Sequence, residues 1–456
     1  MAERTDEERW EPALETWLEP FLAAMSHKAR RRWAPVYVRG LLGPGERKSI
    51  QPIAARVAPA DTDQLHHFVS SPAWDSAPLE TVLARAADRL VGGGQAVLVI
   101  DDTALPKKGT RSVGVARQYA GVLGKRANCQ TLVSLTLARH EVPVPVALRR
   151  FLPAEWTGQP ERMHRAGVPA ARQQGMTKPE IALAELDRLS ATGVRFGVVV
   201  ADAGYGVSAP FRHGLSARGL TWAVGVPRHL KVYPADVQMM EPATTGRGRR
   251  RRRAIPDHVS VAAEDKLAAA AWREISWRCG TKGQLRASFA ALRVRVADGP
   301  AQQIRDKPAQ HLPGEEVWLV GERRASGETK YYLANLSAET ELPRLAAVIK
   351  ARWVCEQAHQ QMKEELGLDH FEGRSWTGLH RHALLTMIAF AFLQHLRLEQ
   401  SRAERGKNPD HRTAAATDAA RRPTRSPRAL RSSPEASMPQ LSHRHQPAST
   451  RVKLPK

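Results

Sequence analysis

The chain has 456 residues, of which 42% are apolar, and a formal net charge of +23 at neutral pH. This length is sufficient for two or three domains with a large core, and the apolar fraction excludes a mostly disordered chain. Because the positive charge is far above what solubility requires and is spread through the sequence, we expect a polyanionic partner, with nucleic acid favoured over a membrane surface.

Residues 1–92 are predicted to form a helical region. Helical periodicity covers residues 10–25 and 79–90, and a Gly-Pro-Gly turn at 43–45 separates helical segments. Basic residues gather at 28–32. This basic face could contact DNA or could simply be solvated, and no helix-turn-helix spacing decides between the two.

Residues 93–232 are predicted to alternate strands and helices. The apolar, β-branched runs 97–101 and 198–202 are typical of buried strands, and each ends in an acid, Asp101 and Asp202. Further strands are expected at 131–137, 142–151 and 221–226, and helices at 177–193, which starts with a capping box, and 209–218. Three strands, a helix, a strand, a helix and a strand is the order of an RNase-H-like mixed sheet in an α/β fold.

Residues 233–340 are predicted to form a β-rich insertion with a sheet of its own. Strands are expected at 276–279, 290–296, 316–320 and 330–333. An arginine run that includes Arg249, Arg250 and Arg251 lies in the Gly-rich approach to these strands. A loop of this kind could reach a phosphate backbone, or it could be a solvated segment; the overall charge favours the first reading.

Residues 341–400 are predicted to return to helical structure, with one long helix at 343–366 that ends at Gly367. Arg352, Glu356 and Lys363 lie near 0°, about 40° and about 20° on the helical wheel, so they share one face. A carboxylate between two cations suits a group that meets a metal while its neighbours meet phosphate. The same spacing also fits an ordinary salt-bridged surface helix.

Residues 401–456 contain thirteen Lys or Arg, four acids, seven prolines and almost no large apolar side chains. We expect a disordered basic tail, which could add sequence-independent affinity for DNA or be a degenerate end of the chain.

The sequence also indicates a cytoplasmic protein without a membrane segment. Its three cysteines are too far apart for a disulfide framework or a zinc site, the N-terminus lacks the order of a secretory signal, and the longest apolar stretch, 383–393, is too short to cross a bilayer.

The three acids match the needs of metal-assisted phosphoryl transfer. Two divalent ions can activate an attacking oxygen and stabilise the leaving oxygen at phosphorus, and carboxylate oxygens suit Mg²⁺ or Mn²⁺. Asp101, Asp202 and Glu356 would supply such ligands from two strands and a helix. Because consecutive strand residues point to opposite faces, Asp101 and Asp102 cannot both reach one metal pair on a regular strand.

The residues also carry a resemblance. Ile100 to Thr103, followed by Pro106-Lys107-Lys108-Gly109, resembles the first catalytic block of DDE transposases of bacterial insertion sequences, and Ala201 to Gly206 resembles the second. Arg352, Glu356 and Lys363 are similar to the Tyr-Arg-Glu-Lys signature of the subgroup with a strand-rich insertion. The resemblance is nearest to insertion-sequence family seven hundred and one. The signature's Tyr position falls on Ile349, which cannot donate a hydrogen bond as a Tyr would.

This resemblance implies an RNase-H-like core interrupted by a β-rich insertion, with two Mg²⁺ or Mn²⁺ ions held by Asp101, Asp202 and Glu356. It implies hydrolysis at transposon ends and strand transfer into target DNA. Partners would be double-stranded DNA, as terminal inverted repeats and target, and a second copy of the chain in a homodimer, with the protein at the nucleoid. By the same resemblance, Arg352 and Lys363 would contact DNA phosphate, and Lys107 and Lys108 are further candidates for DNA contact.

Two other functions remain open at this stage. A catalytically inactive relative of such an enzyme would bind transposon ends as a repressor without cutting them. A stand-alone RNase-H-like nuclease would cut without preference for terminal repeats. The presence of all three acids favours the transposase over the first, and the large insertion with the charge excess favours it over the second.

Overall fold

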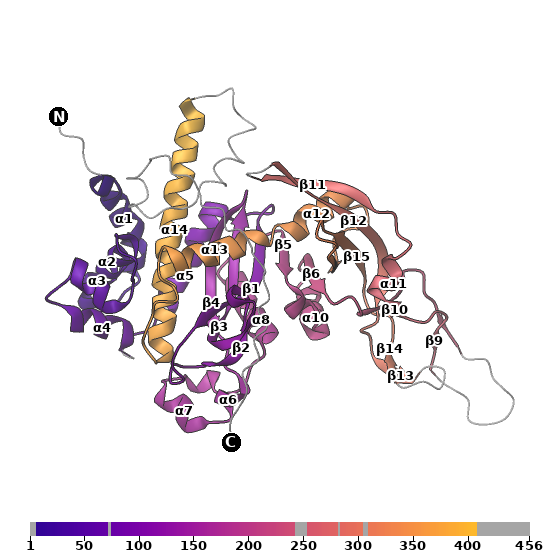
Figure 1. Cartoon of the computed structure of the whole chain (residues 1–456), viewed down its shortest axis with the longest axis horizontal. Coiled ribbons are helices and arrows are strands. Elements are labelled where there is room, and N and C mark those ends of the chain that lie inside the picture. The colour runs from indigo at the N-terminus through magenta and orange to yellow at the C-terminus, as the bar shows by residue number, and fades with distance from the viewer. Residues whose placement is uncertain (1–5, 72–73, 242–252, 281–282, 304–308, 408–456) are drawn as a thin grey trace, which may run out of the picture.

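The computed structural model describes residues 6–71, 74–241, 253–280, 283–303 and 309–407. Figure 1 shows an elongated molecule in which helices α1 to α4 lie at one end, a sheet with covering helices lies in the middle, and a second group of strands lies at the other end. The fold is a mixed α/β fold built on one large sheet.

The N-terminal region is helical, as predicted. Its helices are α1 (Asp6–Ala23), α2 (Lys28–Leu42), α3 (Ile50–Val57), α4 (Thr62–Ser70) and α5 (Ala77–Val91). They pack against the long helix α14 (Trp376–Lys407), where the Tyr37 hydroxyl contacts His382 Nδ1 at 2.9 Å and the Trp17 and Phe392 rings lie 6.3 Å apart. The apolar run 383–393 is therefore the buried centre of α14, as expected for a stretch too short to cross a membrane.

Five strands form the centre of the sheet. They are β1 (Val97–Pro106), β3 (Lys125–Arg139), β4 (Val142–Arg150), β5 (Val198–Ala201) and β6 (Trp222–Val226). Their spatial order is β4, β3, β1, β5, β6; the first three are antiparallel, and β5 is parallel to both β1 and β6. The parallel connections run through α8 (Lys178–Ala191), which starts with the predicted capping box, and through α9 (Ala203–Gly206) and α10 (Ala209–Ala217).

The expectation of a separate inserted sheet is wrong. Strand β16 (Thr329–Ala334) pairs with β6 through Tyr331 to Ala334, so the inserted strands continue the central sheet and bring it to twelve strands in the described residues. Without β16, the backbone groups along one edge of β6 would be unpaired. Pairing with β16 satisfies their hydrogen bonds. The inserted strands in that sheet are β7 (Lys231–Pro234), β10 (Val261–Ala262), β11 (Arg273–Gly280), β12 (Gly283–Val296), β15 (Glu316–Arg323) and β16.

Shorter elements complete the described chain. They are β2 (Ala116–Ala120), η1 (Gly121–Leu123), α6 (Ala154–Thr157), α7 (Pro160–Arg165), η2 (Ala170–Arg172), β8 (Met239–Met240), β9 (Ile255–Pro256), α11 (Ala263–Leu267), β13 (Ala301–Gln303) and β14 (Ala309–His311). None of the helices in the described part of the chain combines the length and apolar character needed to span a bilayer.

The predicted helix 343–366 is two helices, α12 (Leu342–Lys350) and α13 (Trp353–Glu364). The break falls at Ala351 and Arg352, where Arg352 bonds Asp101 and the Arg278 guanidinium stacks 3.6 Å from the Trp353 ring centroid. These tertiary contacts outweigh the local tendency to continue one helix. Gly367 follows α13 with a positive φ of 66°, as its position after the helix predicted.

The predicted disordered tail begins too early. Helix α14 runs through residues 401–407, because this segment is rich in good helix formers such as Glu404 and Arg405. The rest of the predicted tail, 408–456, lies outside the described residues.

Candidate active site

Asp101 lies in the middle of β1, not at its end as the sequence predicted. The pairing of β1 with β5 stops at Ile100 and Ala201, while its pairing with β3 continues to Pro106. The sequence did not indicate this extension, because residues 102–106 lack the alternating apolar pattern of a strand. Their pairing with β3 holds them in the sheet. Asp101 therefore lies one residue beyond the last residue pair between β1 and β5, at the point where the two strands separate.

Asp202 follows β5 directly and caps helix α9. Its Oδ1 accepts hydrogen bonds from the backbone N–H groups of Gly204 at 3.0 Å and Tyr205 at 3.3 Å. The approach of α9 to β6 depends on Gly206, where an added Cβ would lie 1.9 Å from the carbonyl oxygen of Gly225. The glycines of this block thus serve a tight turn and a close backbone approach that fix Asp202 beside β1.

Arg352 joins the other two acids. Its Nη1 donates to Asp101 Oδ2, and its Nη2 donates to Glu356 Oε1 at 2.5 Å. The Asp101 side chain is 11% exposed, whereas that of Glu356 is 59% exposed. Burial raises the pKa of Asp101 to about 7, Arg352 opposes this rise, and the negative charge of Asp202 adds to it. The three predicted acids are therefore electrostatic neighbours.

Asp102 points away from Arg352. Its Oδ1 accepts a hydrogen bond from the Tyr205 hydroxyl at 2.6 Å, and its Oδ2 accepts one from Lys178 Nζ. Burial raises the pKa of Asp102 and the Lys178 charge lowers it. The two adjacent acids thus face different partners, as strand alternation predicted, and only Asp101 shares a partner with Glu356.

A cavity of about 460 Å³ lies beside these acids. Asp202, Arg352 and Glu356 line it on the side of the central strands and α13. The inserted strands and the segment after β6 supply further lining residues, which are Arg228, Arg324, Lys330, Tyr331 and Tyr332. The insertion therefore places cations and tyrosines around the same cavity as the acids.

A buried carboxylate holds together the part of the cavity lining that the insertion supplies. Glu322 on β15 is fully buried and accepts hydrogen bonds from Lys350 Nζ at 2.6 Å, the Tyr332 hydroxyl at 2.7 Å and Arg324 Nε at 3.1 Å. These contacts lower its pKa despite burial. The sequence analysis missed these residues, because the strand predicted at 316–320 ends two residues before Glu322, whereas β15 continues to Arg323.

The donor set suits an oxygen-binding metal in its chemistry. Asp202 and Glu356 border the same cavity, and Asp101 is linked to Glu356 through Arg352. Carboxylate oxygens are the ligands that Mg²⁺ and Mn²⁺ prefer. Within the described residues, however, no three His, Cys, Asp or Glu side chains lie close enough together to hold a metal ion, and Arg352 bridges Asp101 and Glu356.

The predicted DNA-binding residues are not all at this cavity. Lys107 donates to the carbonyl oxygens of Asp369 at 3.1 Å and Phe371 at 2.7 Å, and burial lowers its pKa to about 8. Lys108 is exposed, and Lys363 is half-buried, where burial lowers its pKa. Only Arg352 of this set lines the cavity. Arg249, Arg250 and Arg251 lie outside the described residues.

A buried polar cluster lies between α13 and β3. His359 Nε2 lies 2.8 Å from Ser134 Oγ and 3.4 Å from Cys355 Sγ, and Thr136 Oγ1 lies 3.5 Å from the same sulfur. Burial raises the pKa of Cys355 and lowers that of His359 to about 3, so both side chains are neutral near pH 7. Since Ser134 pairs with Asp101 and Glu356 follows Cys355, this cluster fixes the two acids relative to each other.

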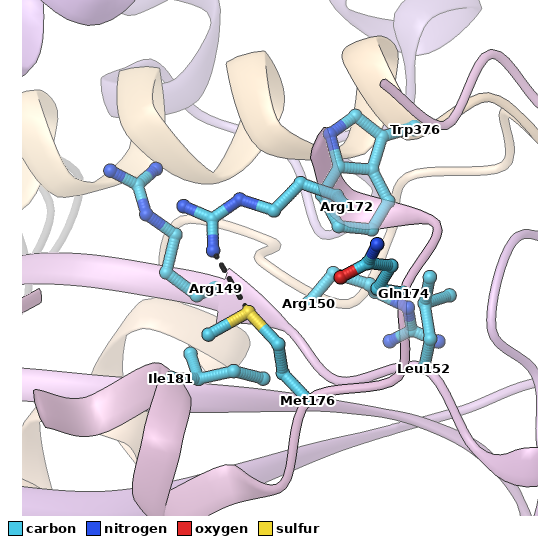
Figure 2. A pocket seen from close by; sticks show the side chains of 8 residues that line it. All are labelled: Arg149, Arg150, Leu152, Arg172, Gln174, Met176, Ile181 and Trp376. Carbon is cyan, nitrogen blue, oxygen red and sulfur yellow. Dashed lines mark hydrogen bonds between the residues drawn. The ribbon is translucent and has the colours of Figure 1, made fainter. Parts of the chain in front are cut away.

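A second arginine-lined pocket has a structural role. Figure 2 shows Arg149, Arg150 and Arg172 around a space of about 30 Å³, which is room for about one water molecule. Arg149 is already bonded to Glu80 and, at 2.6 Å, to Glu185, and Arg172 contacts Met176. Arg149 therefore joins β4 with α5 and α8, Arg172 makes its contact within the loop before α8, and Arg150 donates to the carbonyl oxygens of Thr131 and Val113.

Comparisons with known proteins indicate the family of the chain. Residues 20–284 match the family model for DDE superfamily endonucleases; this range includes Asp101 and Asp202 but not Glu356. A probable transposase for insertion sequence element IS701 of Microchaete diplosiphon is 31% identical over 169 residues, which are 37% of this chain. The chain spans 41% of that relative's length.

A solved structure, the cryo-EM structure of piggyBac transposase synaptic complex with hairpin DNA, matches with a TM-score of 0.40 at 10% identity, over 91% of this chain and 78% of that chain. This likeness is too distant to support a fold assignment. The family match stands independently of it, because it covers more than half of the sequence and both aspartates of the central strands. The chain belongs to the DDE superfamily endonucleases.

Proposed function

We propose that this chain is a DNA transposase that hydrolyses phosphodiester bonds at transposon ends and transfers the freed strands into target DNA. The observation that carries the proposal is that Asp202 and Glu356 line one cavity that also has a cationic lining, while Arg352 joins Asp101 to Glu356 at its border. Acids suit metal-assisted chemistry, and the cations suit a phosphate backbone. Family membership and the partial match to a probable transposase support the same reading.

We propose that the five central strands form an RNase-H-like core and that residues 233–340 are its insertion. The spatial order β4, β3, β1, β5, β6, with three antiparallel strands followed by two parallel ones, supports this assignment. The remaining divisions follow the predicted boundaries, with a helical DNA-contacting region at 1–92 and the core at 93–232 and from 341 to the end of α14 at Lys407, followed by a basic tail.

The three acids would hold two Mg²⁺ or Mn²⁺ ions, which when bound would supply charge neutralisation and an activated oxygen for displacement at phosphorus. Arg352, at the Arg position of the proposed Tyr-Arg-Glu-Lys signature, holds Asp101 and Glu356 and presents a guanidinium to an incoming phosphate. Asp202 is oriented by the N–H groups of α9. Tyr331 and Tyr332, with the nearby cations, would bind and orient the DNA strand.

The partners would be duplex DNA carrying terminal inverted repeats, target DNA, and a second copy of the chain in a homodimer. Lys107, Lys108 and Lys363 remain predicted DNA contacts outside the cavity, and the arginine run at 249–251 remains a predicted phosphate contact. These partners would place the protein at the nucleoid in the cytoplasm.

The test is cleavage of oligonucleotide duplexes that carry the inverted repeats flanking the gene, with and without Mg²⁺. Asp101→Asn and Glu356→Gln should each reduce cleavage by about a thousandfold or more while DNA binding persists, because each removes a metal ligand but no phosphate contact.

Asp102→Asn is the matched control. It makes the same chemical change one residue away, on the face that contacts Tyr205 and Lys178, and should keep most of the activity. Binding without cleavage by the wild-type chain under every metal would indicate a repressor, and cleavage without preference for the repeats would indicate a general nuclease. Equal loss from Asp101→Asn and Asp102→Asn would contradict the site assignment.

A further inference from the structure

A second and larger hollow lies outside the candidate active site. It has a volume of about 970 Å³ and is bordered by α4, α7, the loop after β1 and the loop before α14. Four arginines line it, and we call it the arginine groove; these are Arg111, Arg162, Arg165 and Arg374. Its single acid, Glu372, is already paired with Arg47.

The arginine groove is held in shape by contacts between its segments. The Arg162 guanidinium lies 3.8 Å from the Trp156 ring centroid and donates to the carbonyl oxygen of Thr110 at 2.7 Å. The N–H of Val113 donates to the carbonyl oxygen of Arg374 at 3.0 Å. Three segments distant in sequence therefore form one surface with little freedom to rearrange.

The other three arginines of the groove are exposed. Across the described residues, the side chains of Arg111, Arg165 and Arg374 make no ion pair or hydrogen bond with the protein. Elsewhere in the fold, by contrast, arginines are commonly paired, as Arg149 and Arg212 are. Clustered guanidinium groups without protein partners repel one another, and an anion with several charges in a row relieves that repulsion.

The position of the groove relates it to the candidate active site. Strand β1 carries Asp101 and ends at Pro106, about 17 Å further along at ~3.3 Å per residue. The groove residues Thr110 and Arg111 follow in the next loop. The part of β1 from Asp101 to Pro106 is thus as long as roughly five base pairs of duplex DNA at ~3.4 Å per base pair, and the groove begins beyond its far end.

We propose that the arginine groove binds the phosphate backbone of the DNA duplex that flanks the bond positioned at the candidate active site. The proposal rests on the proposed function for the identity of the cavity, but the groove's own binding does not require cleavage. Guanidinium groups spaced along a groove contact phosphates without reading bases, so the interaction is independent of sequence. The groove thus supplies affinity and register, while the cavity supplies chemistry.

The experiment compares two triple variants of the full chain in equilibrium binding to a fluorescent duplex of about 40 base pairs, in EDTA, across a range of salt concentrations. The groove variant carries Arg111→Ala, Arg165→Ala and Arg374→Ala. The control carries Arg85→Ala, Arg89→Ala and Arg344→Ala. These arginines are also exposed, make no side-chain hydrogen bond or ion pair within the described residues, and lie outside both cavities. Both variants lose the same net charge.

The groove variant should bind at least about tenfold more weakly near 0.1 M salt, and the slope of log affinity against log salt should fall by about two to three, because each phosphate contact contributes about 0.9. The control variant should change the slope by less than about one. Thermal unfolding checks that both variants are folded. Equal losses in the two variants, or no loss in the groove variant, would overturn the proposal.

The two hypotheses fail separately. If the wild-type chain binds the duplex but does not cleave it with Mg²⁺, the proposed nuclease activity fails while the groove's binding role stands. If the duplex is cleaved and the groove variant binds it as well as the wild type does, the groove proposal fails while the nuclease activity stands.

Discussion

Arg352 connects two acids whose side chains differ widely in their exposed fraction. Its planar guanidinium bonds Asp101, which is largely buried, and Glu356, which is largely exposed. Without this cation, burial and the charge of Asp202 would raise the pKa of Asp101 further, so its carboxyl would be protonated near pH 7. A phosphate at the cavity would compete for the same guanidinium, so DNA would loosen the hold of Arg352 on the acids.

This arrangement predicts opposite effects of Arg352→Gln in two conditions. In EDTA the variant should lose about 2 kcal/mol of unfolding free energy, because Asp101 loses its charge-assisted hydrogen bond from Arg352 and is protonated in the folded state. With Mg²⁺ it should gain more thermal stability than the wild type does, since the acids are free to bind the ion. Thermal unfolding with increasing Mg²⁺ measures both effects.

Arg344→Gln on α12 is the control for this experiment, because Arg344 is exposed and lies outside the cavity. It should behave as the wild type in both conditions. An identical Mg²⁺ response in Arg352→Gln and the wild type would show that Arg352 does not compete with the ion.

At the scale of single elements, the sequence predicted whether a segment is a helix or a strand better than it predicted where that element ends. The β-branched runs before Asp101 and Asp202 and the capping box at Thr177 produced the expected strands and helix, because these signals are local. The length of β1 and the break between α12 and α13 depend on β3 and on Asp101, which are distant in sequence. Local patterns do not contain such contacts, so both were predicted incorrectly.

In the candidate site, too, the residues placed by local spacing were predicted and those placed by distant contacts were not. The wheel argument placed Arg352 and Glu356 on one face, and the structure brings them together with Asp101. It could not find Arg324 or Tyr332, because these reach the cavity only through the pairing of β16 with β6. The half-buried position of Lys363 likewise depends on how α13 packs, which a wheel does not show.

The packing of α13 on β3 predicts sensitivity to acid. Burial lowers the pKa of His359 from its ordinary value of 6.5 to about 3, so below about pH 6.5 the unfolded chain binds a proton that the folded chain does not. Unfolding free energy should therefore fall as pH falls from about 6.5 to 3, by about 1.4 kcal/mol per pH unit from this histidine. The buried His382 and the half-buried His380 act in the same direction, because burial lowers the pKa of each.

His359→Gln should be less stable than the wild type near pH 7, because the cluster with Ser134 and Cys355 is disturbed. Between about pH 6 and 4, however, its unfolding free energy should fall less steeply with pH, by about 1.4 kcal/mol per pH unit, because the chain takes up one proton fewer on unfolding. Urea unfolding at several pH values measures this slope. His164→Gln, at an exposed position, should leave the slope unchanged. An unaltered slope in His359→Gln would mean that this histidine is not neutral when folded.

At the scale of the whole molecule, the insertion is joined to the core by more than one strand pairing. Asn335, just after β16, accepts a hydrogen bond from the N–H of Trp222 at 2.6 Å and donates to the carbonyl oxygen of Leu220 at 3.0 Å. Arg212 of α10, which is 2% exposed, is paired with Asp298 of the insertion at 2.6 Å. The same Arg212 donates to the carbonyl oxygen of Gly206 in the block that follows Asp202.

These contacts predict that core and insertion unfold together. Because β16 completes the edge of β6 and Asp298 neutralises a buried cation, neither part keeps its backbone and charges satisfied alone. Chemical denaturation should show one transition, and amide hydrogen exchange should give similar protection to β6 and β16. Asp298→Asn should lower the unfolding free energy by about 3 kcal/mol and reduce protection in both strands.

Glu316→Gln is the matched control, because it weakens an ion pair between the half-exposed Glu316 and Arg293 within the insertion. It should cost less than about 1 kcal/mol. Two separate transitions, or a loss of protection confined to β16 in Asp298→Asn, would show that the insertion is an independent unit. A single transition would mean instead that the cationic lining of the cavity is as rigidly held as the acids, since both belong to one sheet.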